Sequence, residues 1–100
     1  MELLIEKVKK WSKDRNLHVS DPNKQFLKIV EELGEVSGAY ARGNIEEMKK
    51  ELGDVLVTLI IFAQQNQLDL KECLELAYNK ILYRKGKIIN GVFIKEEDLI

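Results

Sequence analysis

Apolar residues recur at spacings of three and four along most of this chain, which is the pattern that predicts amphipathic helices. Pro22 and Gly43 divide the first part of the pattern, because proline favours the first helical position and glycine the position just past a helix end. Cap-type side chains around Pro22 support a helix start there. The spacing predicts four helices: Glu2 to Arg15, Asn23 to Tyr40, Ile45 to Gln65 and Leu70 to Arg84.

The third predicted helix changes character along its length. It begins amphipathic, and from Val55 to Ala63 it is apolar on nearly every side, interrupted only by Thr58. A helix of this kind has to be surrounded by other elements, and a chain of 100 residues buries a limited share of its surface. We therefore expect the chain to form a homodimer or a homotetramer through its helices.

The C-terminal tail carries a different signal. Asn90-Gly91 lies between short segments rich in β-branched residues, and this dipeptide favours a two-residue hairpin turn. The fold class predicted from the whole pattern is all-α: a four-helix bundle completed by oligomerisation, with a short extended or hairpin tail. The length is that of one domain, which we expect to span residues 1–100.

Composition and charge narrow the range of partners. A net charge of −1 gives no field that would attract a nucleic acid polymer or an anionic membrane. The longest apolar stretch is far shorter than the ~20 residues that cross a bilayer, and the charged N-terminal segment does not resemble a signal peptide. The single cysteine, Cys73, excludes an intrachain disulfide. We therefore expect a cytoplasmic protein that binds neither membranes nor nucleic acid polymers.

Four acidic residues form the most informative motif. Glu32 and Glu35 lie three positions apart on the second predicted helix, and Glu51 and Asp54 repeat this spacing on the third. Each pair therefore occupies one helical face, and neighbouring antiparallel helices can bring the two pairs together. Clustered carboxylates repel one another unless a cation neutralises them, and Mg²⁺ or Mn²⁺ is the ion that such oxygen ligands suit.

Glycine precedes the last acid of both pairs, at Gly34 and Gly53. Because glycine inside a helix costs about 1 kcal/mol relative to alanine, we expect helices to approach closely beside the acids. The competing interpretation is that the acids are solvated surface charge, as acidic helix faces usually are. In that case the chain would be a non-catalytic, dimeric helical-bundle interaction module.

The segments EELGEV and KKELGDVL resemble the E-x-x-E and E-x-x-D signature of the all-α NTP pyrophosphohydrolase superfamily. This superfamily includes MazG-like, dimeric dUTPase-like and phosphoribosyl-ATP pyrophosphohydrolase branches. The resemblance continues through the N-terminal helix with its tryptophan, through AYNKILYRKGK and through NGVFIKEEDL, and so covers nearly the whole chain. The chain is most similar to the short, single-domain MazG-like proteins.

This resemblance implies a MazG-like four-helix core in dimers or tetramers, and Mg²⁺-dependent hydrolysis of a nucleoside triphosphate between its α and β phosphates. Periodicity leaves open whether Glu31 or Glu32 is the first metal ligand, and the family pattern selects Glu32. The metal ligands that the resemblance implies are Glu32, Glu35, Glu51 and Asp54.

Further residues are candidates for catalysis and substrate binding. Glu31 or Glu35 could accept the proton of the attacking water. Lys28 on the second predicted helix, together with Lys80 and Arg84 on one face of the fourth, could bind phosphate, and the resemblance adds Asn79. Trp11 or Phe26 could stack on a nucleobase, although a tryptophan in an apolar helical stripe more often belongs to a core. His18 is expected to be exposed to solvent, and one histidine without cysteine partners does not make a zinc site.

These observations favour a Mg²⁺-dependent enzyme that cuts (d)NTPs into (d)NMPs and pyrophosphate and clears non-standard or excess nucleotides. The interaction module is the second hypothesis. A third lies within the enzyme class: a phosphoribosyl-ATP or a dUTP/dCTP-specific hydrolase would share the same acidic motif. The motif leaves the physiological substrate open.

Overall fold

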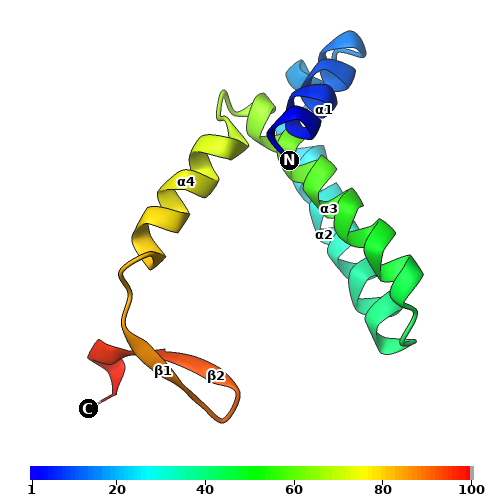
Figure 1. Ribbon diagram of the computed structural model, residues 1–100. Coiled ribbons are helices and arrows are strands. Elements are labelled where there is room, and N and C mark those ends of the chain that lie inside the picture. Colours follow the sequence, from blue (N-terminus) through cyan, green and yellow to red (C-terminus); the bar gives the residue numbers. More distant parts are fainter. Residues whose placement is uncertain (100) are drawn as a thin grey trace. The chain divides into compact units, whose positions relative to one another are not determined.

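The computed structural model describes residues 1–99, which form four α-helices, two short 3₁₀ helices and a β-hairpin (Figure 1). The prediction of an all-α chain of four helices with a C-terminal hairpin is confirmed, whereas its oligomerisation stays a prediction. The chain divides into two units, residues 1–70 and the residues from 71 onward, and the prediction of one domain over residues 1–100 stays a prediction. In chain order the elements are α1 (Glu2–Asp14), η1 (Leu17–Val19), α2 (Pro22–Ala41), α3 (Ile45–Gln65), α4 (Leu70–Ile81), β1 (Gly86–Ile89), β2 (Val92–Lys95) and η2 (Glu96–Asp98).

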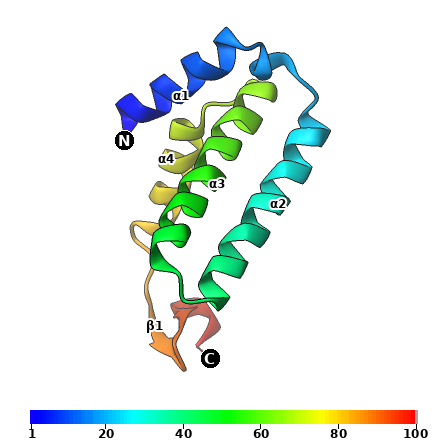
Figure 2. The ribbon, with the colours of Figure 1, turned by 90° about the vertical axis from the view of Figure 1, so that its right-hand side faces the viewer.

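Helices α2 and α3 run side by side in opposite directions and form the centre of the first unit (Figures 1 and 2). The turn between them is fixed by local hydrogen bonds. Gly43 has a positive φ of 66°, and the backbone N–H groups of Gly43 and Asn44 donate to the carbonyls of Tyr40 and Ala39, the Schellman arrangement of a helix end. The Asn44 side chain then accepts from the Glu47 N–H and caps α3.

Apolar side chains between the helices supply the core of the first unit. At the pairing of α2 with α3, the Gln25 amide donates to the carbonyl of buried Thr58 over 3.1 Å, and Phe26 lies against Phe62 with ring centroids 6.0 Å apart. These contacts set the two helices in one axial register. The buried apolar residues are Ile5, Ile29, Ala39, Ile60, Ile61 and Ala63.

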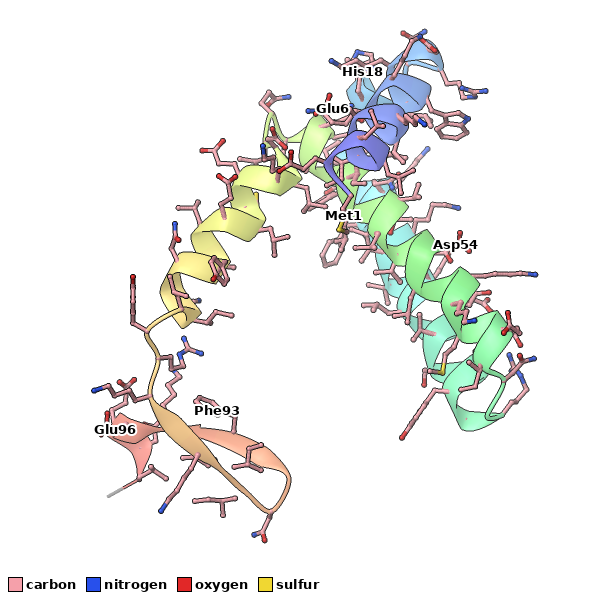
Figure 3. All side chains as sticks on the ribbon, in the orientation of Figure 1. Met1, Glu6, His18, Asp54, Phe93 and Glu96 are labelled. Carbon is pink, nitrogen blue, oxygen red and sulfur yellow. The ribbon has the colours of Figure 1, made fainter. Side chains whose placement is uncertain are left out.

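Helix α1 and η1 pack against α3, toward the end of that helix. The side-chain amides of Gln64 and Gln65 donate to the backbone carbonyls of Lys9 and Leu17 over 3.2 and 3.0 Å. His18 lies in η1 (Figure 3), is only half-exposed, and has a buried Nδ1. The expectation that His18 is exposed is wrong, because η1 folds onto α3 instead of forming an open polar loop.

The second unit contains α4 and the hairpin. Helix α4 ends at Ile81, three residues before its predicted end at Arg84. The Arg84 N–H donates to the Ile81 carbonyl in a tighter i→i−3 turn, so the last predicted helical turn is not α-helical. The other three helices agree with the predicted bounds to within one residue at either end.

The hairpin pairs β1 with β2 in antiparallel register, from Gly86 opposite Lys95 to Ile89 opposite Val92. Asn90 and Gly91 have φ angles of 52° and 77°, the two positive values that a type I′ turn requires. The Asn-Gly signal in the sequence therefore identified the turn correctly.

The expectation that Gly34 and Gly53 mark a close helix approach is wrong within a single chain. A Cβ atom placed on either glycine would meet no neighbouring atom of the described residues within 4 Å. Both positions turn away from the line along which α2 and α3 meet, because they lie nearly opposite the side chains that pair the two helices. Across residues 1–99, no helix is both long enough and apolar enough to cross a membrane.

Candidate metal centre

Three acidic side chains converge on one edge of the α2–α3 pair. Glu32 on α2 and Glu51 on α3 are half-buried, and Asp54, which projects from the middle of α3 (Figure 3), is exposed. One carboxylate oxygen from each lies within 4.8 Å of the others. The i,i+3 spacing places Glu51 and Asp54 on one face of α3, and the register set by the packing of α2 on α3 brings Glu32 opposite them.

The crowding of negative charge affects the pKa of one of the three acids, Glu51. The pKa of the Glu51 carboxyl lies above its usual value, because desolvation disfavours its charge and Asp54 and Glu35 repel it. Glu32 and Glu47 add further repulsion. Uncompensated repulsion of this kind is what a bound cation would remove.

The other candidates on α2 lie close to this group without belonging to it. In the part of the chain that is described, neither Glu31 nor Glu35 is a member of the three-carboxylate group. Glu35 is exposed one turn beyond Glu32, and its charge still acts on Glu51. Lys28 is exposed one turn before Glu32 on the same helical face.

The donor set fits a hard divalent cation. Oxygens bound to one Mg²⁺ at ~2.1 Å lie about 3–4 Å apart. One oxygen from each of the three carboxylates lies within 4.8 Å of the others, which approaches that spacing. A group made of carboxylates, with neither cysteine nor histidine among its described members, suits Mg²⁺ or Mn²⁺ rather than zinc.

The MazG nucleotide pyrophosphohydrolase domain matches residues 21–89 of the chain. This match covers more than half of the sequence and includes both helices that carry the acids. The chain belongs to the MazG family. The sequence resemblance is thereby confirmed at the level of the family, and the roles of individual residues stay predictions.

A protein similar in sequence to this MazG chain comes from a bacteriophage. The "uncharacterized 18.2 kDa protein in rep-hol intergenic region" of Haemophilus phage HP1 is 39% identical over 70 residues. The matched stretch covers 69% of this chain and 43% of the phage protein, so the chain spans less than half the length of this relative. No solved structure matches the chain.

Two of the basic candidates of this MazG chain, Lys80 and Arg84, lie in the second unit. Lys80 and Arg84 line a hollow of about 560 Å³, although Arg84 lies beyond the helix on which it was predicted. Asn79 is exposed on α4 and does not line this hollow. The sequence analysis missed the other lining residues, because only the turn after α4 and the fold of the tail bring them together: Tyr83, Lys85, Glu96 and Glu97.

Trp11 does not belong to the core of the first unit. It is 45% exposed on α1, and the guanidinium of Arg15 lies 4.3 Å from the centre of its ring. The interpretation of Trp11 as a core residue is therefore wrong, because the apolar stripe of α1 is wider than the surface that α3 covers. The contact of Trp11 with substrate stays a prediction.

Proposed function

We propose that this chain is a magnesium-dependent nucleotide pyrophosphohydrolase, with Mn²⁺ as a substitute ion, that cleaves (d)NTPs into (d)NMPs and pyrophosphate. The observation that carries the proposal is the approach of oxygens from Glu32, Glu51 and Asp54 on the two helices that the MazG match includes in full. Removal of excess or non-standard nucleotides in the cytoplasm is the role that such an activity would serve.

Glu32, Glu51 and Asp54 would hold the ion, with Glu35 as the fourth ligand or as the group next to it. The repulsion that raises the pKa of Glu51 supports this assignment, since a divalent cation would relieve it. A solvated acidic surface would instead let its carboxylates spread apart, whereas the packing of α2 on α3 keeps Glu32 and Glu51 half-buried and close.

The bound ion would withdraw charge from the phosphate oxygens and acidify a water molecule. In the proposed reaction a water oxygen would attack the α-phosphorus, the bond from this phosphorus to the bridging oxygen would break, and pyrophosphate would leave with the bridging oxygen. A carboxylate of the chain would accept the proton that the water loses. Glu35 suits this role because it is exposed beside the three-carboxylate group, and Glu31, which lies farther round α2, is the second candidate.

Cationic side chains would neutralise the rest of the triphosphate. Lys28 is positioned for this on the metal-binding face of α2, one turn from Glu32. In the second unit, Lys80 and Arg84 share one hollow and offer a point charge and a planar fork to phosphate oxygens. Asn79 on the same helix is proposed as a neutral donor to the substrate.

The proposal includes assembly into a dimer or tetramer. Large apolar side chains stay exposed on the first unit, among them Leu52 at 50% and Leu56 at 40% on the apolar helix α3. Exposed apolar surface on this scale favours burial against another copy. Sedimentation velocity at micromolar concentration should show a species larger than the monomer; a monomer alone would contradict the assembly.

Pyrophosphate release from a panel of (d)NTPs with Mg²⁺ tests the activity. Wild type should release equal amounts of (d)NMP and pyrophosphate, and EDTA should abolish the release. Glu51→Gln and Asp54→Asn should each lower kcat/KM at least about 100-fold, since even outer-sphere changes cost 10- to 100-fold. Glu46→Gln is the matched control, because Glu46 is exposed on α3 and pairs only with Lys49 among the described ion pairs.

The same assay distinguishes the enzyme from the non-catalytic interaction module. The module would be a folded oligomer that hydrolyses no nucleotide, and Glu51→Gln would be as inactive and as well folded as Glu46→Gln. No further variant is needed to distinguish the two hypotheses.

A further inference from the structure

The hollow of about 560 Å³ in the second unit is lined by charged groups of both signs. Three cationic side chains come from the end of α4 and the turn after it, and two glutamates come from η2. Three positive charges against two negative ones leave the walls with a net charge of +1. A charged hollow of this size suits a small anionic ligand. The charged lining residues are Lys80, Arg84, Lys85, Glu96 and Glu97.

The three cations of the hollow have no acidic partner within salt-bridge distance among residues 1–99. Arg84 is nevertheless half-buried, so its guanidinium has lost part of its hydration without gaining an ion pair from the described chain. The planar fork of a guanidinium suits two phosphate oxygens at once. The hollow therefore contains a basic subsite that the described carboxylates of the chain do not fill.

The backbone holds the two glutamates at this subsite. The Glu96 N–H donates to the Lys85 carbonyl over 2.7 Å, one position beyond the last pair of the hairpin ladder (Figure 3). The Leu99 N–H donates to the Glu96 carbonyl and closes the single turn of η2. Because these bonds use main-chain atoms, a change of either glutamate side chain leaves them in place. The hairpin therefore keeps the acids beside the cations without help from charge attraction.

We propose that this hollow binds an oligophosphate and that Glu96 and Glu97 lower its affinity, so that the anion is released. The inference rests on the proposed function in one respect, because Lys80 and Arg84 are the phosphate-binding residues named there. A phosphate chain carries several negative charges, and two carboxylates on the same walls repel it. A lowered affinity serves a hydrolase at a position that pyrophosphate has to leave, since product release limits the turnover of many enzymes.

The first test measures the affinity of the hollow directly. The full chain is titrated with inorganic pyrophosphate in EDTA, by calorimetry. Glu96→Gln and Glu97→Gln should each lower the Kd about 3- to 10-fold, because each removes one like charge from the walls, and Lys85→Gln should raise the Kd by a similar factor. These effects should shrink between about 50 mM and about 500 mM salt, because salt screens exposed charges.

Matched controls lie on the neighbouring positions. Asp98→Asn removes an acid from η2 and Lys87→Gln removes a cation from β1, and neither residue lines the hollow. Both should keep the Kd within about twofold of wild type. If Asp98→Asn lowered the Kd as much as Glu96→Gln does, the effect would come from net charge, and the inference would fail.

NMR locates the anion and identifies its source. Pyrophosphate should shift the amide signals of Lys85 and Glu96, whose hydrogen bond joins the two sides of the hollow, more than that of Glu51. Shifts confined to α2 and α3 would overturn the inference. Displacement of pyrophosphate by the α,β-imido analogue of dATP would show that the hollow also takes the phosphate chain of a nucleotide, and binding without displacement would assign it to free pyrophosphate.

Turnover separates this inference from the proposed function. In Glu96→Gln, pyrophosphate should inhibit (d)NTP hydrolysis about 3- to 10-fold more strongly than in wild type, as its lower Kd requires. Unchanged pyrophosphate affinity in both glutamate variants, or no pyrophosphate binding by wild type and variants alike, would overturn the inference even if wild type hydrolyses (d)NTPs. A wild type that hydrolyses no nucleotide, with the expected changes in pyrophosphate affinity, would refute the proposed function and leave the anion site supported.

Discussion

Desolvation, together with repulsion from the acids of α2 and α3, raises the pKa of Glu51. Its pKa is raised above the usual 4.5, so the fold favours its protonated form. That contribution to stability is fully present below the pKa of the unfolded chain and is lost as the pH rises through the raised pKa. At neutral pH the metal-free protein therefore contains unrelieved repulsion around Glu51.

Glu51→Gln should consequently raise the melting temperature of the metal-free protein at neutral pH, and this gain should shrink to nothing below about pH 4.5. Mg²⁺ at 100 times its Kd should stabilise wild type by roughly 3 kcal/mol, or about 10 °C or more, and should not stabilise the variant. Calorimetry with EDTA and with Mg²⁺ measures both effects. Equal Mg²⁺ stabilisation of the two proteins would remove Glu51 from the ligand set.

The proton acceptor is the second question at the scale of residues. Because Glu35 lies next to the three-carboxylate group and Glu31 lies farther round α2, Glu35→Gln should lower kcat at least about 100-fold, the usual contribution of general-base catalysis. Glu31→Gln should leave kcat within a few-fold of wild type. Single-turnover rates at saturating Mg²⁺ separate these effects from metal loss, and the opposite ranking would assign the base to Glu31.

At the scale of elements, the end of α2 and the start of α3 show why local sequence was informative. Gly43 supplies the positive φ and Asn44 the side-chain cap, and both act within a few residues of their own position. The end of α4 lacks such signals. Helix α4 ends in a tight turn after Ile81, and no glycine or proline between Ile81 and Gly86 marks this end in the sequence.

The hairpin requires glycine at position 86, because the facing strand leaves no room there for a side chain. A Cβ atom at Gly86 would collide with the Ile94 carbonyl and the ring of Phe93, and a backbone carbonyl cannot rotate away as a side chain can. Gly86→Ala should therefore destabilise the hairpin by about 1–3 kcal/mol. Loss of cross-strand NOEs between Ile88 and Phe93 would report it, and retention of these NOEs would contradict the prediction.

At the scale of the whole molecule, the exposed glycines distinguish an isolated chain from an assembly. Gly34 lies in open space inside α2, so Gly34→Ala should stabilise an isolated chain by about 0.5–1 kcal/mol. Denaturation midpoints, with sedimentation on the same samples, measure this. If another copy packs closely on Gly34, the variant will instead be destabilised and will dissociate. That result would show that Gly34 allows close helix approach between copies of the chain.

The sequence by itself determined the helices, the Asn90-Gly91 turn and the pairing of acids within each helix, because these depend on periodicity and on caps that act over a few residues. Only the tertiary structure decided which acids meet. The packing of α2 on α3 places Glu32 opposite Glu51 and Asp54 and leaves Glu35 outside the group. It also decided that Trp11 is exposed beside an apolar hollow. Helical spacing fixes which side chains share a face, whereas contacts between helices depend on the axial register and on the area each neighbour covers, and neither is encoded in a local stretch of sequence.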